Sequence, residues 1–386
     1  MKLEGIRVLD FSLFLPGPLL TQMMGDQGAE VIKIESLGEG EPNRHIGLKR
    51  DGVTVYFANT HRGKKSLTLN LKEPEAIEIV MQLAEQADVI VEGFRPGVAK
   101  RLGIDYAAVR RRAPGIVYAS LSAFGQTGPY VQRPAHDPAV QGLIGAISVN
   151  EGHDGKPTLS GVQVADMLNA TMSLSGIMMA LYRRERTSKG DFLDMAMMDC
   201  VIAAMPNNMG PMFAEDRAPI PKYERTWGGY AMMSVYETKD GKHIVLGGAE
   251  VKFARNLLTA LGREDLLEIC AGEPGPGQEP AKAFFRETFL TKTRDEWSDW
   301  FEGKDICYGP VNDLKEALED PQLLHRQMVL TDDRGWRHLG IPIKFQDEPG
   351  RVDFACPGHG ADTDDIIGRL GYEAAAITLL REKGVC

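Results

Sequence analysis

Short apolar runs alternate with amphipathic segments over the first 125 residues of the chain. The segments 21–28, 74–87 and 106–112 carry apolar residues at helical spacing, which predicts helices. Strands that alternate with helices indicate a mostly parallel sheet covered on both faces, so we expect an α/β fold with a Rossmann-like large domain. The predicted strands are 6–10, 30–35, 66–71, 89–92 and 116–122.

A different pattern begins near residue 225 and predicts a smaller α+β domain. Two β-rich runs, 233–237 and 243–246, flank a turn that contains Gly241, which is typical of a hairpin. Helices are expected at 254–261, 280–291 and 293–301, followed by a strand or loop return at 307–312. We therefore predict a large domain at 1–224, a small domain at 225–325 and a C-terminal return to the large domain at 326–386.

The carboxylate of Asp166 stands directly before a long apolar run that extends to Arg184. An acidic residue in this place is typical of a helix N-cap, where the helix dipole and free backbone N–H groups gather. Such donors can stabilise negative charge on an acyl oxygen, so Asp166 is a candidate nucleophile or acid/base, with His136 as its partner. The alternative is that Asp166 only caps the helix. The methionines of this region could line an adaptable acyl pocket, but we favour the interpretation that they fill core.

Composition and charge narrow the range of functions. The net charge of −10 argues against general nucleic-acid binding, although a local basic patch can still bind phosphate. The five cysteines form no C-x-x-C pair, so no metal site is expected. No G-x-G-x-x-G follows a strand, so neither a nicotinamide nor a flavin cofactor is expected. The sequence shows neither a signal-peptide pattern nor an apolar run long enough to span a membrane, so we expect the protein in the cytoplasm.

Several segments resemble one family when they are taken in order. The family is the class III coenzyme A transferases (CaiB/BaiF-like), which also contains the α-methylacyl-CoA racemases. No one segment would be convincing alone, but the agreement covers nearly the whole chain. The segments are LEGIRVLDF at 3–11, PGP at 16–18, GAEVIKIE at 28–35, GKKSLTLNLK at 63–72, ADVIVEGFRPG at 87–97, FGQTGPY at 124–130 and RTSKGD at 186–191.

This resemblance implies an interlocked homodimer and coenzyme A as the acyl carrier. Phosphate binding needs cations, and the candidates are the cluster Arg62, Lys64 and Lys65, together with Arg95 and Arg101. By resemblance Phe94 and Arg101 contact the nucleotide, and the loop 14–18 lies near the pantetheine arm. The family often has a polar residue where Leu15 stands. The expected CoA-binding residues are Phe14, Pro16, Lys65, Phe94, Arg95, Arg101 and Asp137.

By resemblance Asp166 is the catalytic residue of a transferase. It would attack the donor thioester to give a mixed anhydride, which CoA thiolate converts to an aspartyl-CoA thioester before the acceptor carboxylate enters. His136 followed by Asp137 is instead typical of the racemases, and Glu250 also resembles a racemase position. In that case His136 and Asp166 would be the acid/base pair, supported by Glu250. Gln141 is typical of the transferases, whereas the glycine-rich loop of some transferases is replaced by 226–230.

Three functions therefore remain open. We favour a CoA-transferase that acts on an acyl-CoA and a small carboxylic acid. The first alternative is a 2-methylacyl-CoA racemase or epimerase, and the second is a non-catalytic CoA-binding protein. Neither nucleic acid nor a membrane is expected as a partner.

Overall fold

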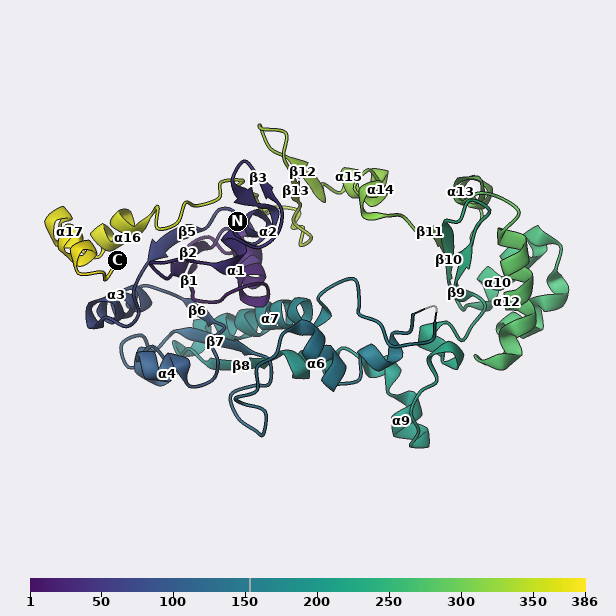
Figure 1. Cartoon of the computed structure of the whole chain (residues 1–386), viewed down its shortest axis with the longest axis horizontal. Helices are drawn as coiled ribbons and strands as arrows, with labels where there is room; N and C mark the ends of the chain where they lie inside the picture. The colour runs from purple at the N-terminus through teal and green to yellow at the C-terminus, as the bar shows by residue number, and fades with distance from the viewer. Residues whose placement is uncertain (153) are drawn as a thin grey trace. The chain divides into compact units, whose positions relative to one another are not determined.

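The computed structural model describes residues 1–152 and 154–386, which form two compact units. The first unit contains residues 1–144, 162–204 and 321–386, and the second contains 145–161 and 205–320. The chain thus leaves the first unit and returns to it twice (Figure 1). The boundaries 1–224, 225–325 and 326–386 stay a prediction about domains, because compactness does not test which segments fold alone.

A six-stranded sheet forms the centre of the first unit, in the order β5-β2-β1-β6-β7-β8 with all neighbours parallel. The predicted α/β fold with a mostly parallel sheet is confirmed. An edge strand at 192–196 was not predicted, because its run is short and includes the exposed Asp194. The strands are β1 (Arg7–Asp10), β2 (Glu30–Glu35), β5 (Lys65–Thr68), β6 (Val89–Glu92), β7 (Val117–Ser122) and β8 (Phe192–Ala196).

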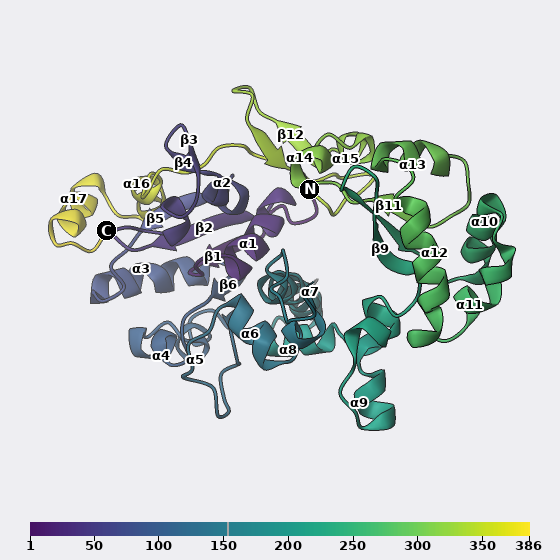
Figure 2. The same ribbon diagram turned by 45° about the vertical axis from the view of Figure 1, so that its right-hand side comes forward.

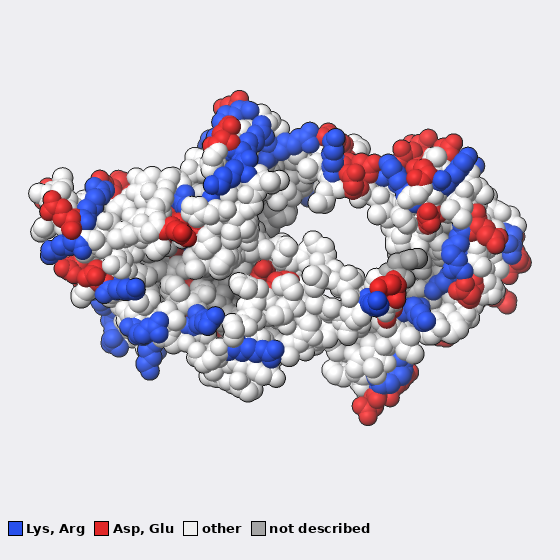
Figure 3. Space-filling view, viewed as in Figure 1, with Lys and Arg blue, Asp and Glu red and all other residues white. Residues whose placement is uncertain are grey.

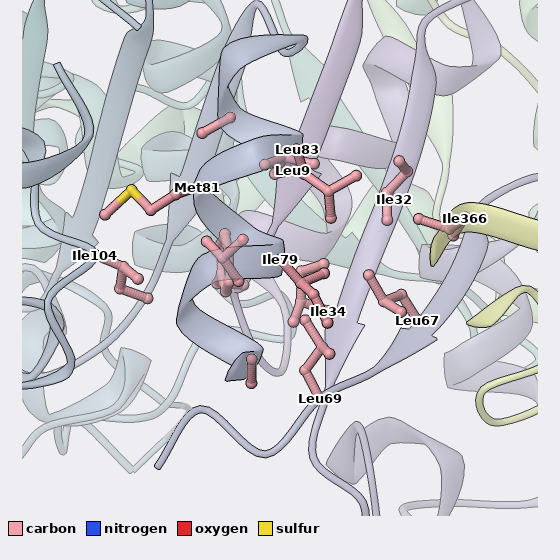
Figure 4. Packing of buried hydrophobic residues seen from close by; sticks show 14 of the residues in the cluster. Leu9, Ile32, Ile34, Leu67, Leu69, Ile79, Met81, Leu83, Ile104 and Ile366 are labelled. Carbon is pink, nitrogen blue, oxygen red and sulfur yellow. The ribbon is translucent and has the colours of Figure 1, made fainter. Parts of the chain in front are cut away.

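Both faces of this sheet are buried, which explains the continuous apolar runs of its strands. Successive side chains point to opposite faces, so Leu9 packs with Ile32 and Ile90 on one side, and Val8 packs with Val31 on the other. Helices α3 (Pro74–Glu85), α16 (Thr363–Arg369) and α17 (Ala374–Glu382) cover the first side. Helices α1 (Pro16–Asp26) and α7 (Val164–Thr187) cover the second (Figures 1 and 2). Figure 4 shows the first of these cores.

Helix α1 begins earlier than the predicted 21–28, because Pro16 at its first position already has a helical φ. Helix α7 is long and apolar enough to cross a membrane by length and composition alone. It nevertheless buries Ile177 and Leu181 in the core of the sheet, as a core helix does.

The remaining elements of the first unit are short. They are β3 (Lys49–Arg50), β4 (Val53–Thr54), α2 (Val55–His61), α4 (Val98–Leu102), α5 (Tyr106–Val109), α6 (Asp137–Leu143), α8 (Met197–Ala203), α15 (Pro321–His325), β12 (Val329–Thr331) and β13 (Arg337–Leu339).

The second unit contains the predicted hairpin, which is confirmed as β9 (Met233–Glu237) and β10 (His243–Gly247), with β11 (Tyr308–Pro310) antiparallel to β10. Its core is rich in aromatic residues, including Tyr236 and Trp297. Thr293 and Glu296 form a capping box that fixes the start of one helix. The helices are α9 (Gly210–Glu215), α10 (Val251–Leu261), α11 (Leu267–Ala271), α12 (Glu279–Phe289), α13 (Arg294–Phe301) and α14 (Leu314–Ala317).

Candidate active site

A cavity of about 740 Å³ lies at the carboxyl ends of β1, β6 and β7 in the first unit. It is lined by the segments that follow these strands, by residues 131–139 and by the first turns of α7. Strands β1 and β6 are neighbours at the point where the strand order changes direction. Open parallel sheets bind ligands in the crevice at such a switch point. The sheet topology therefore marks this cavity as the candidate active site.

Asp166 lines this cavity but is not the N-cap of its helix. Helix α7 begins at Val164, so Asp166 lies within the first turn. The Asp137 carboxylate caps the helix from outside by accepting hydrogen bonds from the backbone N–H groups of Ala165 (2.7 Å) and Asp166 (3.2 Å). These two N–H groups are thus occupied, and the expectation that they are free to stabilise an acyl oxygen is wrong. The reason is tertiary, because α6 brings Asp137 to the start of α7.

The pKa of Asp166 is raised from the ordinary 3.8 to about 7. Burial is the larger cause, because a carboxylate loses hydration there, and the negative charge of Asp137 is the second cause. Near neutral pH the group is therefore present in both protonation states. A carboxyl group of this kind can act as a nucleophile when ionised and as an acid when protonated.

His136 lies at the rim of the same cavity and precedes α6. Its ring meets the ring of Phe14 edge-on, with centroids 5.5 Å apart and an interplanar angle of 85°. The structure therefore brings His136, Phe14 and Asp166 to one cavity. Glu250 belongs to the second unit, where it precedes α10, and its support of the pair His136 and Asp166 stays a prediction.

The other predicted CoA-binding residues lie in different surroundings. Pro16, Phe94 and Arg95 line the cavity. Asp137 is almost fully buried and bound to backbone N–H groups, so its contacts favour a positioning role. Arg101 lies exposed in the last turn of α4, and Figure 3 shows Lys and Arg side chains gathered over the part of the surface where α4 lies.

The cluster around Arg62 is not a free phosphate-binding patch. Arg62 is 3% exposed and paired with Asp26 at 2.8 Å. Lys64 is buried and 3.0 Å from Asp10. Their predicted phosphate role is wrong, because both cations are bound by carboxylates that lie far away in the sequence.

Lys65 differs from these two cations because it is half-buried. It is paired with Glu30 at 2.6 Å. Its contact with phosphate stays a prediction.

A second cavity, of about 500 Å³, lies beyond the ends of β2 and β5. It is lined by Phe94, Leu102 and Lys72, among others. Phe94 and Leu13 line both cavities, so the two cavities adjoin at these side chains.

Sequence reasoning missed several groups of this site. Asn169 lies one turn after Asp166 on the same helix face, a spacing that could have revealed it. Arg133 adds a cation to the lining.

Glu92 is a further buried carboxyl group close to the site. It accepts a hydrogen bond of 2.7 Å from the backbone N–H of Phe94, a cavity-lining residue. Burial raises the pKa of Glu92 to about 7 as well. A pH profile of this protein therefore has to separate the titration of Glu92 from that of Asp166.

The part of the chain that the structure describes contains no cluster of side chains suited to bind a metal ion. Within residues 1–152 and 154–386, no group of three His, Cys, Asp or Glu side chains is placed to hold a metal ion. The five cysteines are free thiols.

Known proteins with related sequences or structures share this architecture. A family model described as CoA-transferase family III matches residues 3–363. An acyl-CoA transferase from Fusarium pseudograminearum is 30% identical over 99% of this chain and 88% of its own length. A succinate–glutarate CoA-transferase from Agrobacterium fabrum is 32% identical over 95% of each chain. The crystal structure of a CaiB/BaiF family protein from Brucella suis matches with a TM-score of 0.82 and 28% identity, covering 95% of this chain and 99% of that chain.

Proposed function

The chain belongs to CoA-transferase family III, and from this premise we propose that it moves coenzyme A from an acyl-CoA thioester to a free carboxylic acid through a covalent intermediate on Asp166. The observation that carries the proposal is the Asp166 carboxyl group, which lines the cavity at the strand ends and has a pKa near 7. A buried carboxylate is poorly hydrated, which makes it a better nucleophile than one in water.

The proposed reaction divides one difficult exchange into easier steps. The ionised Asp166 attacks the thioester carbonyl, and the C–S bond breaks to release CoA thiolate and leave a mixed anhydride. The thiolate then attacks the aspartyl carbonyl, which releases the donor acid as a carboxylate and leaves an aspartyl-CoA thioester. The acceptor carboxylate enters by the same two steps in reverse, so the Asp166 carboxylate is regenerated.

Each tetrahedral intermediate carries an oxyanion that needs hydrogen-bond donors. Since Asp137 occupies the N–H groups of Ala165 and Asp166, other groups of the cavity have to supply them. His136 and Arg133 both line the cavity and can donate. We assign His136 to the acyl pocket, where it binds either the developing oxyanion or the acceptor carboxylate.

Coenzyme A is proposed to extend from this cavity towards the second one. Phe94 lines both cavities, and the exposed Arg101 lies on the neighbouring helix α4. In this arrangement Phe14 and Pro16 lie along the pantetheine arm and Arg95 and Arg101 contact phosphate, with Lys65 as a further cation. The position at the switch point of the sheet supports this arrangement.

We also propose a cytoplasmic homodimer. Helix α7 exposes large apolar side chains on the face away from the sheet, with Met179 71% and Tyr182 64% exposed. Apolar side chains that gather on one helix face are typical of a protein interface. The resemblance to interlocked dimers supports a second copy of this chain as the partner.

A racemase is the second candidate, because His136 and Asp166 line the same cavity and could serve as two bases. One experiment separates the two functions. The enzyme is incubated in deuterium oxide with succinyl-CoA or a single 2-methylacyl-CoA epimer, together with glutarate, oxalate or acetate. We expect new acyl-CoA products and no α-deuteration. Rapid α-deuteration without acyl exchange would instead identify a racemase. If neither reaction occurs, a CoA-binding protein is the function that remains.

A further inference from the structure

The loop between β1 and α1 forms part of the cavity wall, and buried side chains hold it at two successive points. Lys33 donates a hydrogen bond to the carbonyl oxygen of Ser12. The Glu41 carboxylate accepts a hydrogen bond of 2.9 Å from the backbone N–H of Phe14. The Asn43 side-chain amide donates to the carbonyl oxygen of the same Phe14. Both polar groups of the Phe14 backbone are thus bound by side chains that follow β2.

The Phe14 backbone has a conformation that phenylalanine rarely adopts. Its φ is +65°, in the left-handed region that ordinarily suits glycine. A bulky residue remains there only when its surroundings determine the conformation by several contacts. The two hydrogen bonds from Glu41 and Asn43 are such contacts.

The two side chains are themselves firmly placed. Glu41 and Asn43 are both 0% exposed. The ammonium group of Lys33 lies 3.0 Å from the Glu41 carboxylate and balances its charge. His61 lies 3.8 Å from the same carboxylate, and burial holds the pKa of His61 well below its ordinary value, so its ring is neutral. The Glu41 side chain therefore remains a hydrogen-bond acceptor that has no competing solvent.

The left-handed backbone directs the Phe14 ring against His136 at the cavity rim, with centroids 5.5 Å apart. Glycine would adopt this φ without help but would offer no ring. We propose that Glu41 and Asn43 are positioning residues that hold Phe14 in the left-handed conformation, so that its ring fixes the side chain of His136 in the acyl pocket.

The consequence for catalysis rests on the proposed CoA-transferase function. If His136 binds the acceptor carboxylate, a loosened Phe14 should raise the acceptor KM more than it lowers kcat. We expect Asn43→Ala to raise that KM by about tenfold with less than a threefold change in kcat.

The test that does not depend on activity uses the NMR signals of the His136 ring. The chain has only 8 histidines, so the His136 signals can be assigned from the spectrum of His136→Gln. Asn43→Ala, Glu41→Gln and Phe14→Gly should each move these signals. Asn43→Ala added to Phe14→Gly should move them no further, because no ring remains to be positioned. Thr60→Val is the matched control, since it removes a different hydrogen bond of the Asn43 amide, of 3.4 Å, and leaves the Asn43 group that binds Phe14 in the chain.

Two results would overturn the proposal. His136 signals that stay in place in Asn43→Ala would show that Asn43 does not act on His136. An equal displacement with and without the Phe14 ring would show that the effect bypasses Phe14. Should Glu41→Gln fail to fold because it removes a buried countercharge of Lys33, Asn43→Ala decides alone. An enzyme without CoA transfer would refute the proposed function, whereas the NMR arm would still decide the positioning role.

Discussion

Replacing Asp166 by asparagine should stabilise the folded protein at neutral and alkaline pH while it removes the proposed nucleophile. The raised pKa means that the folded state holds the proton of Asp166 more tightly than an unfolded chain does. Above pH 7 the native protein keeps an ionised carboxylate in a poorly hydrated cavity beside Asp137. Asparagine has nearly the same shape and no charge, so it avoids this unfavourable energy.

The magnitude follows from the displaced pKa. A rise from 3.8 to about 7 corresponds to roughly 4 kcal/mol of differential stability, taken as an upper value. Because the pKa of Asp166 is higher in the folded state than in the unfolded state, protonation of Asp166 stabilises the folded protein. This contribution to the free energy of unfolding is complete below pH 4 and is lost as the pH rises through 7. The free energy of unfolding of Asp166→Asn should therefore exceed that of the wild type by an amount that grows between pH 4 and 7. We expect this amount to grow by about 2 to 4 kcal/mol and then to stay constant.

Urea denaturation of both proteins at several pH values between 4.5 and 8.5 measures this difference. Asp347→Asn is the control for the loss of one charge, because Asp347 lies exposed in a loop. Glu92 also titrates near pH 7, but it is present in both proteins and cancels from the comparison. A difference between wild type and Asp166→Asn that does not change with pH would refute the reasoning. A wild type that is the more stable protein at pH 8 would refute it as well.

Further predictions concern pH dependence, CoA affinity, stability and assembly. The rate of acyl-enzyme formation should rise about tenfold from pH 6 to pH 8 in single-turnover experiments. Asp137→Asn should move the midpoint of this pH profile below 7, because one negative charge beside Asp166 is removed. An unmoved midpoint would exclude Asp137 as a cause of the raised pKa of Asp166. Arg101→Ala should weaken the binding of CoA by about tenfold in a titration at low salt, with the fold unchanged, and an unchanged CoA affinity would remove Arg101 from the site. Arg62→Ala should instead lower the free energy of unfolding by about 3 kcal/mol, because Asp26 is left buried without its ion-pair partner. Sedimentation should give a dimer of the 42.4 kDa chain, and a stable, active monomer would contradict the proposed assembly.

The sequence predicted those parts of the fold that depend on local pattern. Continuous apolar runs predict the buried strands β1, β2 and β6, and a glycine-containing turn predicts the hairpin β9–β10. Strand β8 lies at the sheet edge, and the exposed Asp194 interrupts its apolar run, so its sequence pattern is weak. Local pattern also led to Asp166, because an acidic residue at the start of an apolar helix is visible without a structure.

The interactions that tune the site depend instead on residues distant in sequence. Asp137 reaches the start of α7 only because α6 packs there, and no periodicity reveals that its carboxylate takes two backbone N–H groups. Arg62 and Lys64 have the spacing of a basic patch, yet tertiary structure buries both against carboxylates. The hydrogen bond between Glu41 and Phe14 likewise joins two loops that local pattern cannot relate.

Covalent acylation of Asp166 during transfer is the step on which the proposed function depends. The direct measurement is mass spectrometry of the protein after incubation with succinyl-CoA and hydroxylamine, which converts an activated carboxyl group to a hydroxamate. The account predicts a hydroxamate on Asp166 alone, which forms only when acyl-CoA is present and is missing from Asp166→Asn. Transfer of CoA without any modification of Asp166, or a hydroxamate at a different residue, would contradict the account.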